Sequence, residues 1–320
     1  MKQILTGEQR PKKSLSFADP KQGKSSFHYH ATQPLLSLNY DGGDPGLPPG
    51  VGDQVWVQNY PPDLIEVSSS TSQWKRSGKV GAMIIQDIVD VRDQVMNGAD
   101  ELILTDWMNC GGDKSIKAHM PRPASVLADG LVVLNQQVLN WLMADPSWNI
   151  KDPRGAGKNV QAFYGDRLDR MNLILRWLLA LPINVSLCTW ATQEYKKGPN
   201  DAESKPTGKK IPDIGGKLDQ WGPGAVDACL FHYSELRNGL ARYFVSTKST
   251  NSTEIVGVRG ARYGLPEIVD VTIGIPENKL PPAMTVGNPA YVNPWNRVWG
   301  SAQLVDAGKT LVAKSTTKPS

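Results

Sequence analysis

The residues with the clearest chemical pattern lie near the N-terminus, where Ala18 to Ser26 reads ADPKQGKSS. This segment matches the phosphate-loop pattern G-x-x-x-x-G-K-[ST], with alanine in place of the first glycine. Gly23 would let the backbone curl around an anion, Lys24 would neutralise the anion's charge, and Ser25 could ligate magnesium. The alternative is that GKS is a common tripeptide in a lysine-rich segment. The predicted phosphate-binding residues are Ala18, Asp19, Pro20, Lys21, Gln22, Gly23, Lys24, Ser25 and Ser26.

Two aspartates follow apolar runs and are candidates for the chemistry at such a loop. Asp106 ends ELILTD, which is typical of a buried strand, and could orient magnesium's water molecules beside Ser25. Asp41 follows LLSLNY and could orient an attacking water, with Asn39 as the weaker candidate. Asp41 precedes two glycines, so a purely turn-forming role is the alternative.

The elements that would position these residues alternate between strand-like and helix-like patterns. A β-like run at 13–18 precedes the loop, and a helix could open after it, which is the order that a phosphate loop needs. Further strands are expected at 34–40, 54–60, 101–106 and 184–190, and helices at 81–96, 124–143 and 166–180. Helices that alternate with strands indicate an α/β fold with a mainly parallel central sheet. Three late strand-like runs without long helices between them predict antiparallel strands at the C-terminal side.

A lysine-rich segment at 195–217 has almost no apolar side chains and is expected to form a long exposed loop. Its lysines could follow a nucleic-acid backbone, while Tyr195 and Trp221 could stack on bases. A solvated loop without a partner is the alternative. The candidate DNA-binding residues are Lys196, Lys197, Lys205, Lys209 and Lys210.

Length and composition fit a single globular unit of 320 residues with a net charge of +4. The three cysteines lack metal-site or disulfide spacing, and His28 and His30 lack a third ligand. The N-terminus has no apolar signal segment, and no stretch is apolar enough to span a membrane, so a cytoplasmic protein is expected. We predict a flexible tail at 1–11, a core at 12–275 and an irregular C-terminal extension at 276–320.

Over about residues 12–275, the chain resembles the phage-encoded RecA/RadA-like P-loop ATPases. The pieces that match in order are ADPKQGKSS, LNYDGG, LILTD, RWLLALPINVSLCTW, the loop ending KKIPDIGGKL, and VDACLFHYSE. The resemblance implies a RecA-like fold, ATP and Mg²⁺ as cofactors, and ATP hydrolysis. It also implies action on single-stranded DNA in phage recombination, annealing or replication. The implied partners are copies of this chain in a filament or ring, and phage single-strand-binding or replication proteins.

Two further residues acquire roles from this resemblance. The strand NVSLCTW places Thr189 or Trp190 at the position of a sensor for the terminal phosphate, where related proteins often show Thr-Ala-His. Here Thr192 and Gln193 stand near the histidine's place, and a buried core threonine is the alternative reading of Thr189. Arg262 in RGARYG is similar to the arginine of the Lys-Asn-Arg-Phe-Gly motif, which can reach a neighbouring subunit's phosphates. The alternative is a surface strand residue.

The first glycine of the loop and the sensor histidine are both missing from this chain. A different hypothesis is therefore a nucleotide-binding scaffold of the same fold that has lost catalysis and supports a replication or recombination assembly. A small-molecule phosphotransferase is less favoured, because no second substrate-binding motif is visible.

Overall fold

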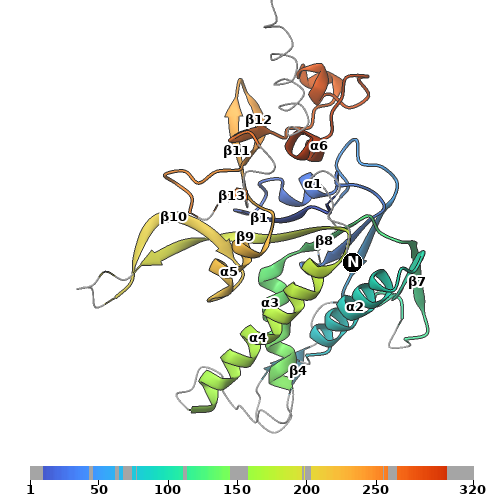
Figure 1. Cartoon of the computed structure of the whole chain (residues 1–320), viewed down its shortest axis with the longest axis vertical. Coiled ribbons are helices and arrows are strands. Elements are labelled where there is room, and N and C mark those ends of the chain that lie inside the picture. Colours follow the sequence, from blue (N-terminus) through green and yellow to red (C-terminus); the bar gives the residue numbers. More distant parts are fainter. Residues whose placement is uncertain are drawn as a thin grey trace, which may run out of the picture.

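The computed structural model describes residues 10–42, 46–61, 65–67, 74–76, 78–110, 114–144, 158–196, 198, 203–254, 256–258 and 265–300. These residues form one α/β unit built around a large sheet (Figure 1). Along the hydrogen-bonded path of that sheet the strand order is β14-β12-β11-β1-β9-β8-β2-β3.

The central strands are parallel to one another. They are β1 (Lys13–Ala18), β2 (Leu35–Asn39), β3 (Val55–Asn59), β8 (Ser125–Asp129), β9 (Asn184–Lys196) and β11 (Ala228–Arg237). The antiparallel additions are β10 (Lys205–Asp213) on β9, β12 (Leu240–Ser246) and β13 (Gly257–Val258) on β11, and β14 (Ile268–Asp270) on β12. The expectation of a mainly parallel sheet with antiparallel strands toward the C-terminal side is confirmed.

Strand β1 lies inside the sheet, between β9 and β11, and its side chains are buried on both faces. Leu15 and Phe17 enter the main hydrophobic core, whereas Ser14 and Ser16 face the other side. This alternation lets β1 pack apolar side chains on one face and small polar groups on the other. The carboxyl end of β1 therefore emerges at the middle of the sheet, where ligand sites of parallel sheets form.

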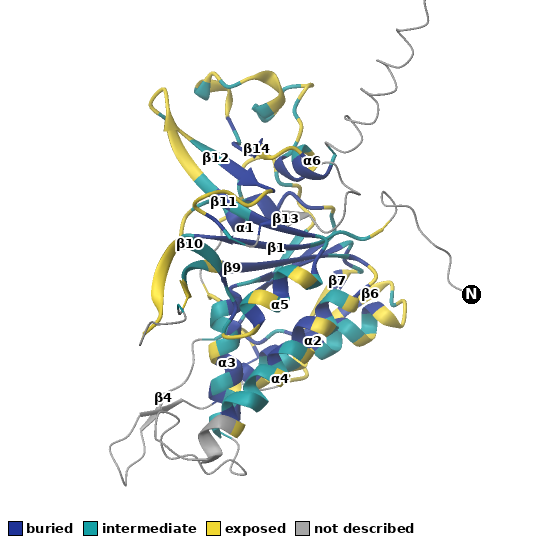
Figure 2. Ribbon diagram, turned by 60° about the vertical axis from the view of Figure 1, so that its left-hand side comes forward, coloured by how far each residue is buried: buried dark blue, intermediate teal, exposed yellow. Residues whose placement is uncertain are grey.

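The helical layer on one face consists of α2 (Lys79–Met96), α3 (Leu131–Ala144) and α4 (Lys158–Ala180), with α5 (Leu218–Ala225) beside α4. In α2 the buried residues Ile84, Ile88, Val91 and Val95 recur at helical spacing, as the sequence predicts. Figure 2 shows these helices gathered on one side of the sheet. Their apolar faces and the facing strand residues form the main core.

The opposite face carries the short helices α1 (Lys24–His28) and α6 (Pro294–Trp299), which contact each other. Phe27 of α1 and Trp295 of α6 pack in a second core, with ring centroids 5.6 Å apart. Between β14 and α6 lie the 3₁₀ turns η2 (Pro276–Asn278) and η3 (Pro282–Met284). The described residues from 276 to 300 contain two 3₁₀ turns and α6, and α6 joins the fold by covering α1.

Three sequence-based expectations about elements are wrong. Residues 124–143 do not form one helix, because β8 occupies the first part and Gly130 separates it from α3. The strand at 101–106, β6 (Glu101–Thr105), is not in the central sheet; among the described residues it pairs with β7 (Lys117–Pro121) in a separate hairpin. Much of the expected loop at 195–217 is strand β10.

A second small hairpin, β4 (Ile65–Val67) with β5 (Trp74–Arg76), lies between β3 and α2 along the chain. Among the described helices, none is both long and apolar enough to cross a lipid bilayer.

Candidate phosphate-binding site

The predicted phosphate loop connects β1 to α1 and turns through two left-handed residues, Lys21 with φ of 63° and Gly23 with φ of 75°. Ala18 is the last residue of β1, is fully buried, and is not among the residues with positive φ. An alanine is therefore accommodated where the pattern has its first glycine. Lys21 is a non-glycine residue in the left-handed region, a conformation that concentrates at functional sites.

Gly23 is a position of the loop at which a side chain would be crowded. A Cβ there would lie 3.1 Å from Cδ1 of Tyr243, which reaches the loop from β12. The left-handed φ of Gly23 adds a conformational reason for glycine. Tyr243 was not a sequence candidate, because nothing in the run LARYFVSTK indicates that it meets the loop.

Lys24 is only 9 % exposed, and its ammonium lies back over the loop. Its Nζ is 3.4 Å from the carbonyl oxygen of Ala18 and 3.5 Å from that of Asp19. Both contacts are long for hydrogen bonds, so they hold the ammonium weakly. A strong anionic acceptor placed in the loop would compete with them readily.

Asp129, at the carboxyl end of β8, is the acidic residue that the structure brings to the loop. Its carboxylate lies beside the Ser25 side chain, close enough for the hydroxyl to favour the ionised form, and within electrostatic range of Lys24. Burial raises the pKa of Asp129, while Ser25, Lys24 and the Gly130 backbone act in the opposite direction. A hydroxyl and a carboxylate held together in this way match the protein ligands that a hydrated Mg²⁺ uses beside phosphates.

Asp41 comes directly after β2 and meets the same site from the neighbouring strand. Gly130 has φ of +92°, and a Cβ there would lie 2.3 Å from Oδ1 of Asp41. Glycine at 130 thus lets the two carboxylates approach. Desolvation and then the charge of Asp129 raise the pKa of Asp41, while Lys24 lowers it.

The remaining polar groups form a row along the carboxyl edge of the sheet. Asn39 lies beside Asp129 in register and donates from Nδ2 to Oδ1 of Asn59, at 2.7 Å. Cys188 of β9 is fully buried within electrostatic range of Asp129, Lys24 and Asp41, and its thiol pKa is raised well above its usual value, mainly by burial. Thr189, next in the chain, is 1 % exposed and donates from Oγ1 to the carbonyl of Asp213.

Thr189 therefore has the buried and hydrogen-bonded environment of a core threonine. Its predicted sensor role stays a prediction, while Cys188 is the β9 residue with charged site groups as neighbours.

Two buried histidines lie beneath the loop and share one serine hydroxyl. Oγ of Ser16 is 2.8 Å from Nε2 of His28 and 2.9 Å from Nε2 of His232. A serine hydroxyl donates a single proton, so one imidazole accepts it and the other donates its own N–H. Burial and the Lys24 charge lower the pKa of His28 to about 3, and burial, His28 and Lys24 lower that of His232. Both rings are neutral at physiological pH and leave Lys24 as the cationic side chain beside them.

Asp106 does not take part in this arrangement, and its expected place at the end of a central strand is wrong. It follows β6 in the separate hairpin, where its carboxylate accepts hydrogen bonds from the backbone N–H and the Nδ2 of Asn109. The carboxylate thus closes a local turn. The acidic residue beside Ser25 is Asp129 rather than Asp106.

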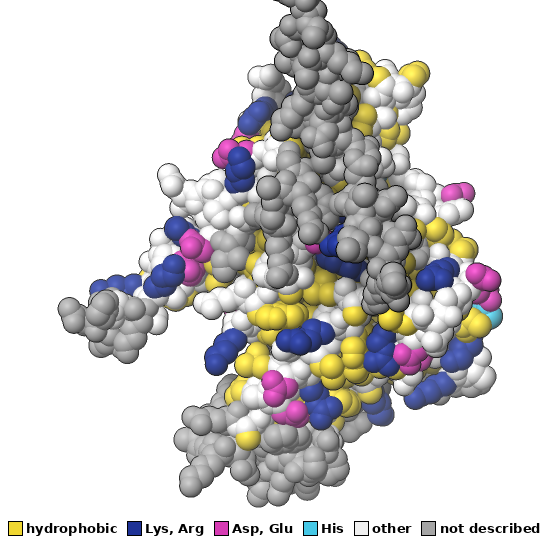
Figure 3. Space-filling model, viewed as in Figure 1, with side chains coloured by type: hydrophobic (Ala, Val, Ile, Leu, Met, Phe, Trp, Pro, Cys, Tyr) yellow, Lys and Arg dark blue, Asp and Glu magenta, His cyan; other side chains and the backbone are white. Residues whose placement is uncertain are grey.

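The lysine candidates belong to the β9–β10 hairpin, and several are paired with acids. Lys196 lies 2.9 Å from Glu194, Lys209 pairs with Glu254, and Lys210 pairs with Asp19 of the phosphate loop. Lys205 lies opposite Lys196 in the ladder. In the view of Figure 3, cationic side chains on the β9–β10 hairpin alternate with acidic ones and do not form one continuous patch.

Lys197 and Arg262 lie outside the described residues. In the described part of the chain, no group of three or more His, Cys, Asp or Glu side chains is placed to hold a metal ion by itself.

No protein family model and no curated protein matches this chain. Among solved structures, its fold is similar to that of a KaiC-like protein from the hyperthermophilic archaeon Pyrococcus horikoshii. The TM-score is 0.35 and the sequence identity 8%, over 83% of this chain and 87% of that chain.

Proposed function

We propose that this chain binds a nucleoside triphosphate, ATP by the resemblance of its sequence, at the loop between β1 and α1. The observation that carries the proposal is the meeting of Lys24, Ser25 and Asp129 at the carboxyl edge of a parallel sheet. Lys24 would contact the phosphates, and the backbone between Ala18 and Gly23 would surround them.

The metal-binding residues in this proposal are Ser25 and Asp129. Magnesium is held by one or two protein oxygens together with waters and substrate phosphates, so the pair suffices without a larger acidic cluster. When bound, the ion would neutralise phosphate charge. The pair of carboxylates facing Lys24 leaves an excess of negative charge, which favours a divalent cation.

Hydrolysis is assigned to Asp41, which would accept a proton from the attacking water. Its raised pKa favours this role, because a general base works best when its pKa approaches the operating pH. Asn39 is held by Asn59 and suits a positioning role. A scaffold without catalysis would show the same nucleotide affinity but no turnover.

Steady-state ATP turnover with three variants tests this assignment. Lys24→Ala is expected to lose turnover, and Asp41→Asn is expected to lose turnover while it keeps nucleotide affinity. Asp106→Asn is the matched control and is expected to behave as the wild type. Full turnover in Lys24→Ala would exclude the proposed site, whereas binding without turnover in the wild type would favour the scaffold.

We further propose that the β9–β10 hairpin contacts single-stranded DNA. Trp190 and Tyr195 are exposed by 41% and 60%, so both rings are available for stacking on bases. The Lys210–Asp19 ion pair joins the β9–β10 hairpin to the phosphate loop, which offers a route by which bound nucleotide could affect the position of the hairpin. Assembly of several copies along the strand, as a filament or ring, belongs to the same proposal.

Fluorescence anisotropy with labelled single strands tests the DNA contact. We expect salt-dependent binding that weakens several-fold in Tyr195→Ala, because loss of one stacking contact costs about 1–3 kcal/mol. Leu173→Ala, at an exposed residue of α4 on the helical layer, is the control. Absence of binding at low salt, or equal affinity in both variants, would contradict the proposal.

A further inference from the structure

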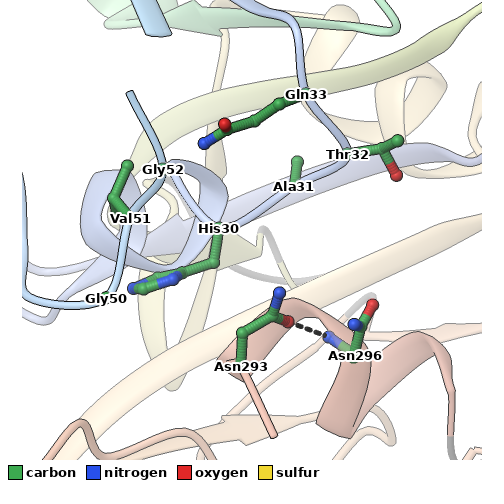
Figure 4. Close-up of a pocket in the computed structure, with 9 residues that line it drawn as sticks. All are labelled: His30, Ala31, Thr32, Gln33, Gly50, Val51, Gly52, Asn293 and Asn296. Atoms are coloured by element: carbon green, nitrogen blue, oxygen red, sulfur yellow. Dashed lines mark hydrogen bonds between the residues drawn. The ribbon is translucent and has the colours of Figure 1, made fainter. Parts of the chain in front are cut away.

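A cavity of about 360 Å³ opens away from the phosphate loop, at the other end of α1. It lies between the residues that follow α1, the loop at 50–52 and the start of α6 (Figure 4). The residues that give it polar character are His30, Thr32, Gln33, Asn293 and Asn296.

Among the described residues that line this cavity, no side chain carries a carboxylate, ammonium or guanidinium group. His30 is 4 % exposed, and its Nε2 has no hydrogen-bond partner among the described residues. Burial and then the nearby Arg297 lower the pKa of His30 to about 4. The ring is thus neutral at physiological pH and offers one donor and one acceptor.

Arg297 does not turn the cavity into an anion site. Its Nη1 donates to the carbonyl oxygens of Asp270 and Thr272, and its Nε donates to that of Val292. A charged ligand in the cavity would lose hydration without gaining an opposite charge on the lining, which is costly.

Two of the lining amides are held in place by neighbouring backbone. Gln33 packs directly on Gly52, where a Cβ would lie 2.3 Å from Oε1 of Gln33. Oδ1 of Asn293 accepts from the backbone N–H of Asn296, at 2.8 Å, which leaves the Nδ2 of Asn293 turned toward the cavity. The hydrogen bond from Asn296 fixes the direction of the Asn293 amide before any ligand enters.

We propose that this cavity binds an uncharged nucleobase through its hydrogen-bonding edge. Asn and Gln amides present a donor beside an acceptor and pair with the same pattern on a base, adenine above all. His30, whose Nε2 is buried without a partner among the described residues, lies beside these amides in the cavity wall. Its volume is at the small end for ligand pockets, about 300–1,000 Å³, which suits a base or nucleoside rather than a triphosphate.

The base could belong to a free nucleoside or to a nucleic-acid strand, which share this chemistry. Nucleosides carry no phosphate, so their binding does not depend on the loop at Lys24. Nucleoside binding in this cavity can therefore be tested independently of nucleotide binding at Lys24.

Histidine-selective NMR labelling of the full chain gives a direct test, because the sequence contains four histidines. Titration with adenosine, guanosine, cytidine and uridine is expected to shift the His30 ring resonances saturably for at least one nucleoside. His119, which lies on the β6–β7 hairpin with its side chain 54% exposed, is the internal control and is expected to stay unchanged. His30→Gln assigns the resonance.

Asn296→Leu and Gln33→Leu are each expected to weaken nucleoside binding by about tenfold or more, and Lys24→Ala is expected to leave it unchanged. Because Asn296 is exposed, Asn296→Leu is expected to fold even if Gln33→Leu does not. Competition by a short single strand would assign the base to nucleic acid, and its absence to a free nucleoside. No saturable shift with any nucleoside at millimolar concentration, or equal binding in Asn296→Leu, would overturn the proposal and leave a water-filled cavity.

Discussion

At the scale of single residues, Lys24, Asp41 and Asp129 carry the charges of the candidate site, and Lys24 lies within electrostatic range of both carboxylates. The pattern around Lys24 specifies both residue type and spacing, and Asp41 follows a strong apolar run next to two glycines. Asp129 follows the short run SVLA, and the apolar pattern resumes as LVVLNQQVL directly after Gly130, so only the pair Asp129–Gly130 interrupts it. Periodicity cannot separate a buried strand from the helix after it in such a segment, so ELILTD gave the stronger but misleading signal.

At the residue scale, Asp129→Asn and Asp106→Asn are expected to affect nucleotide affinity differently. Asp129→Asn removes the carboxylate beside Ser25, so we expect magnesium-dependent nucleotide affinity to fall by about 10- to 100-fold, as for changes in groups that support a metal site. Asp106→Asn should leave that affinity unchanged, because its carboxylate closes a local turn. Equilibrium titrations with and without Mg²⁺ measure the difference, and the opposite ranking would restore Asp106 as the metal-site acid.

At the scale of elements, the site depends on how β8 ends. Gly130 turns the chain from β8 into α3 with a left-handed φ, and its N–H donates to the carbonyl of Cys188. The strand end and the turn together place Asp129 and Asp41 at one point of the sheet edge. The polar composition of residues 195–217 predicts a loop, but most of this segment is β10, whose pairing with β9 satisfies its backbone and overrides composition.

Gly130→Ala tests the element-scale account. The left-handed φ alone costs about 1–2 kcal/mol for a residue with a side chain, and the added methyl would also displace the Asp41 carboxylate. Gly239→Ala is the matched control, because Gly239 has φ of +76° and open space around it. We expect both variants to lose stability in urea unfolding, but only Gly130→Ala to lose ATP turnover. Equal turnover in the two would show that Asp41 is not held by this turn.

At the scale of the whole molecule, apolar clusters of different composition cover the two faces of the sheet. The helical layer over one face was largely predictable from its periodicity. The face under α1 was not, because its covering helix α6 comes from the far end of the chain and is too short for a periodic signal. The hairpin β6–β7 is joined to the sheet edge by side chains, with Gln58 donating to the carbonyl of Thr105 and to Asp87.

Asp87 gives the molecule a measurable dependence of stability on pH. This carboxylate in α2 is fully buried, and desolvation raises its pKa from 3.8 to about 7 against hydrogen bonds from Trp107 and Gln58. The folded state then holds a proton that the unfolded chain releases, so this contribution to stability is complete below pH 3.8 and is lost as pH rises through 7.

Relative to Asp87→Asn, we expect the wild type's free energy of unfolding to fall by roughly 2 kcal/mol between pH 5 and pH 7. Urea unfolding of both proteins at each pH gives the comparison. Parallel pH profiles would mean that Asp87 is ionised in the folded protein across this range.

The claim on which the account rests is that Lys24 holds the phosphates of a bound nucleotide. Equilibrium titration of the wild type and Lys24→Ala with Mg-ATP, under identical salt, tests it most directly. We predict saturable binding with one site per chain and a loss of about 10- to 100-fold in affinity in Lys24→Ala, since a hydrogen bond to a charged group contributes about 1.5–3 kcal/mol. No saturable binding by the wild type, or unchanged affinity in Lys24→Ala, would contradict it.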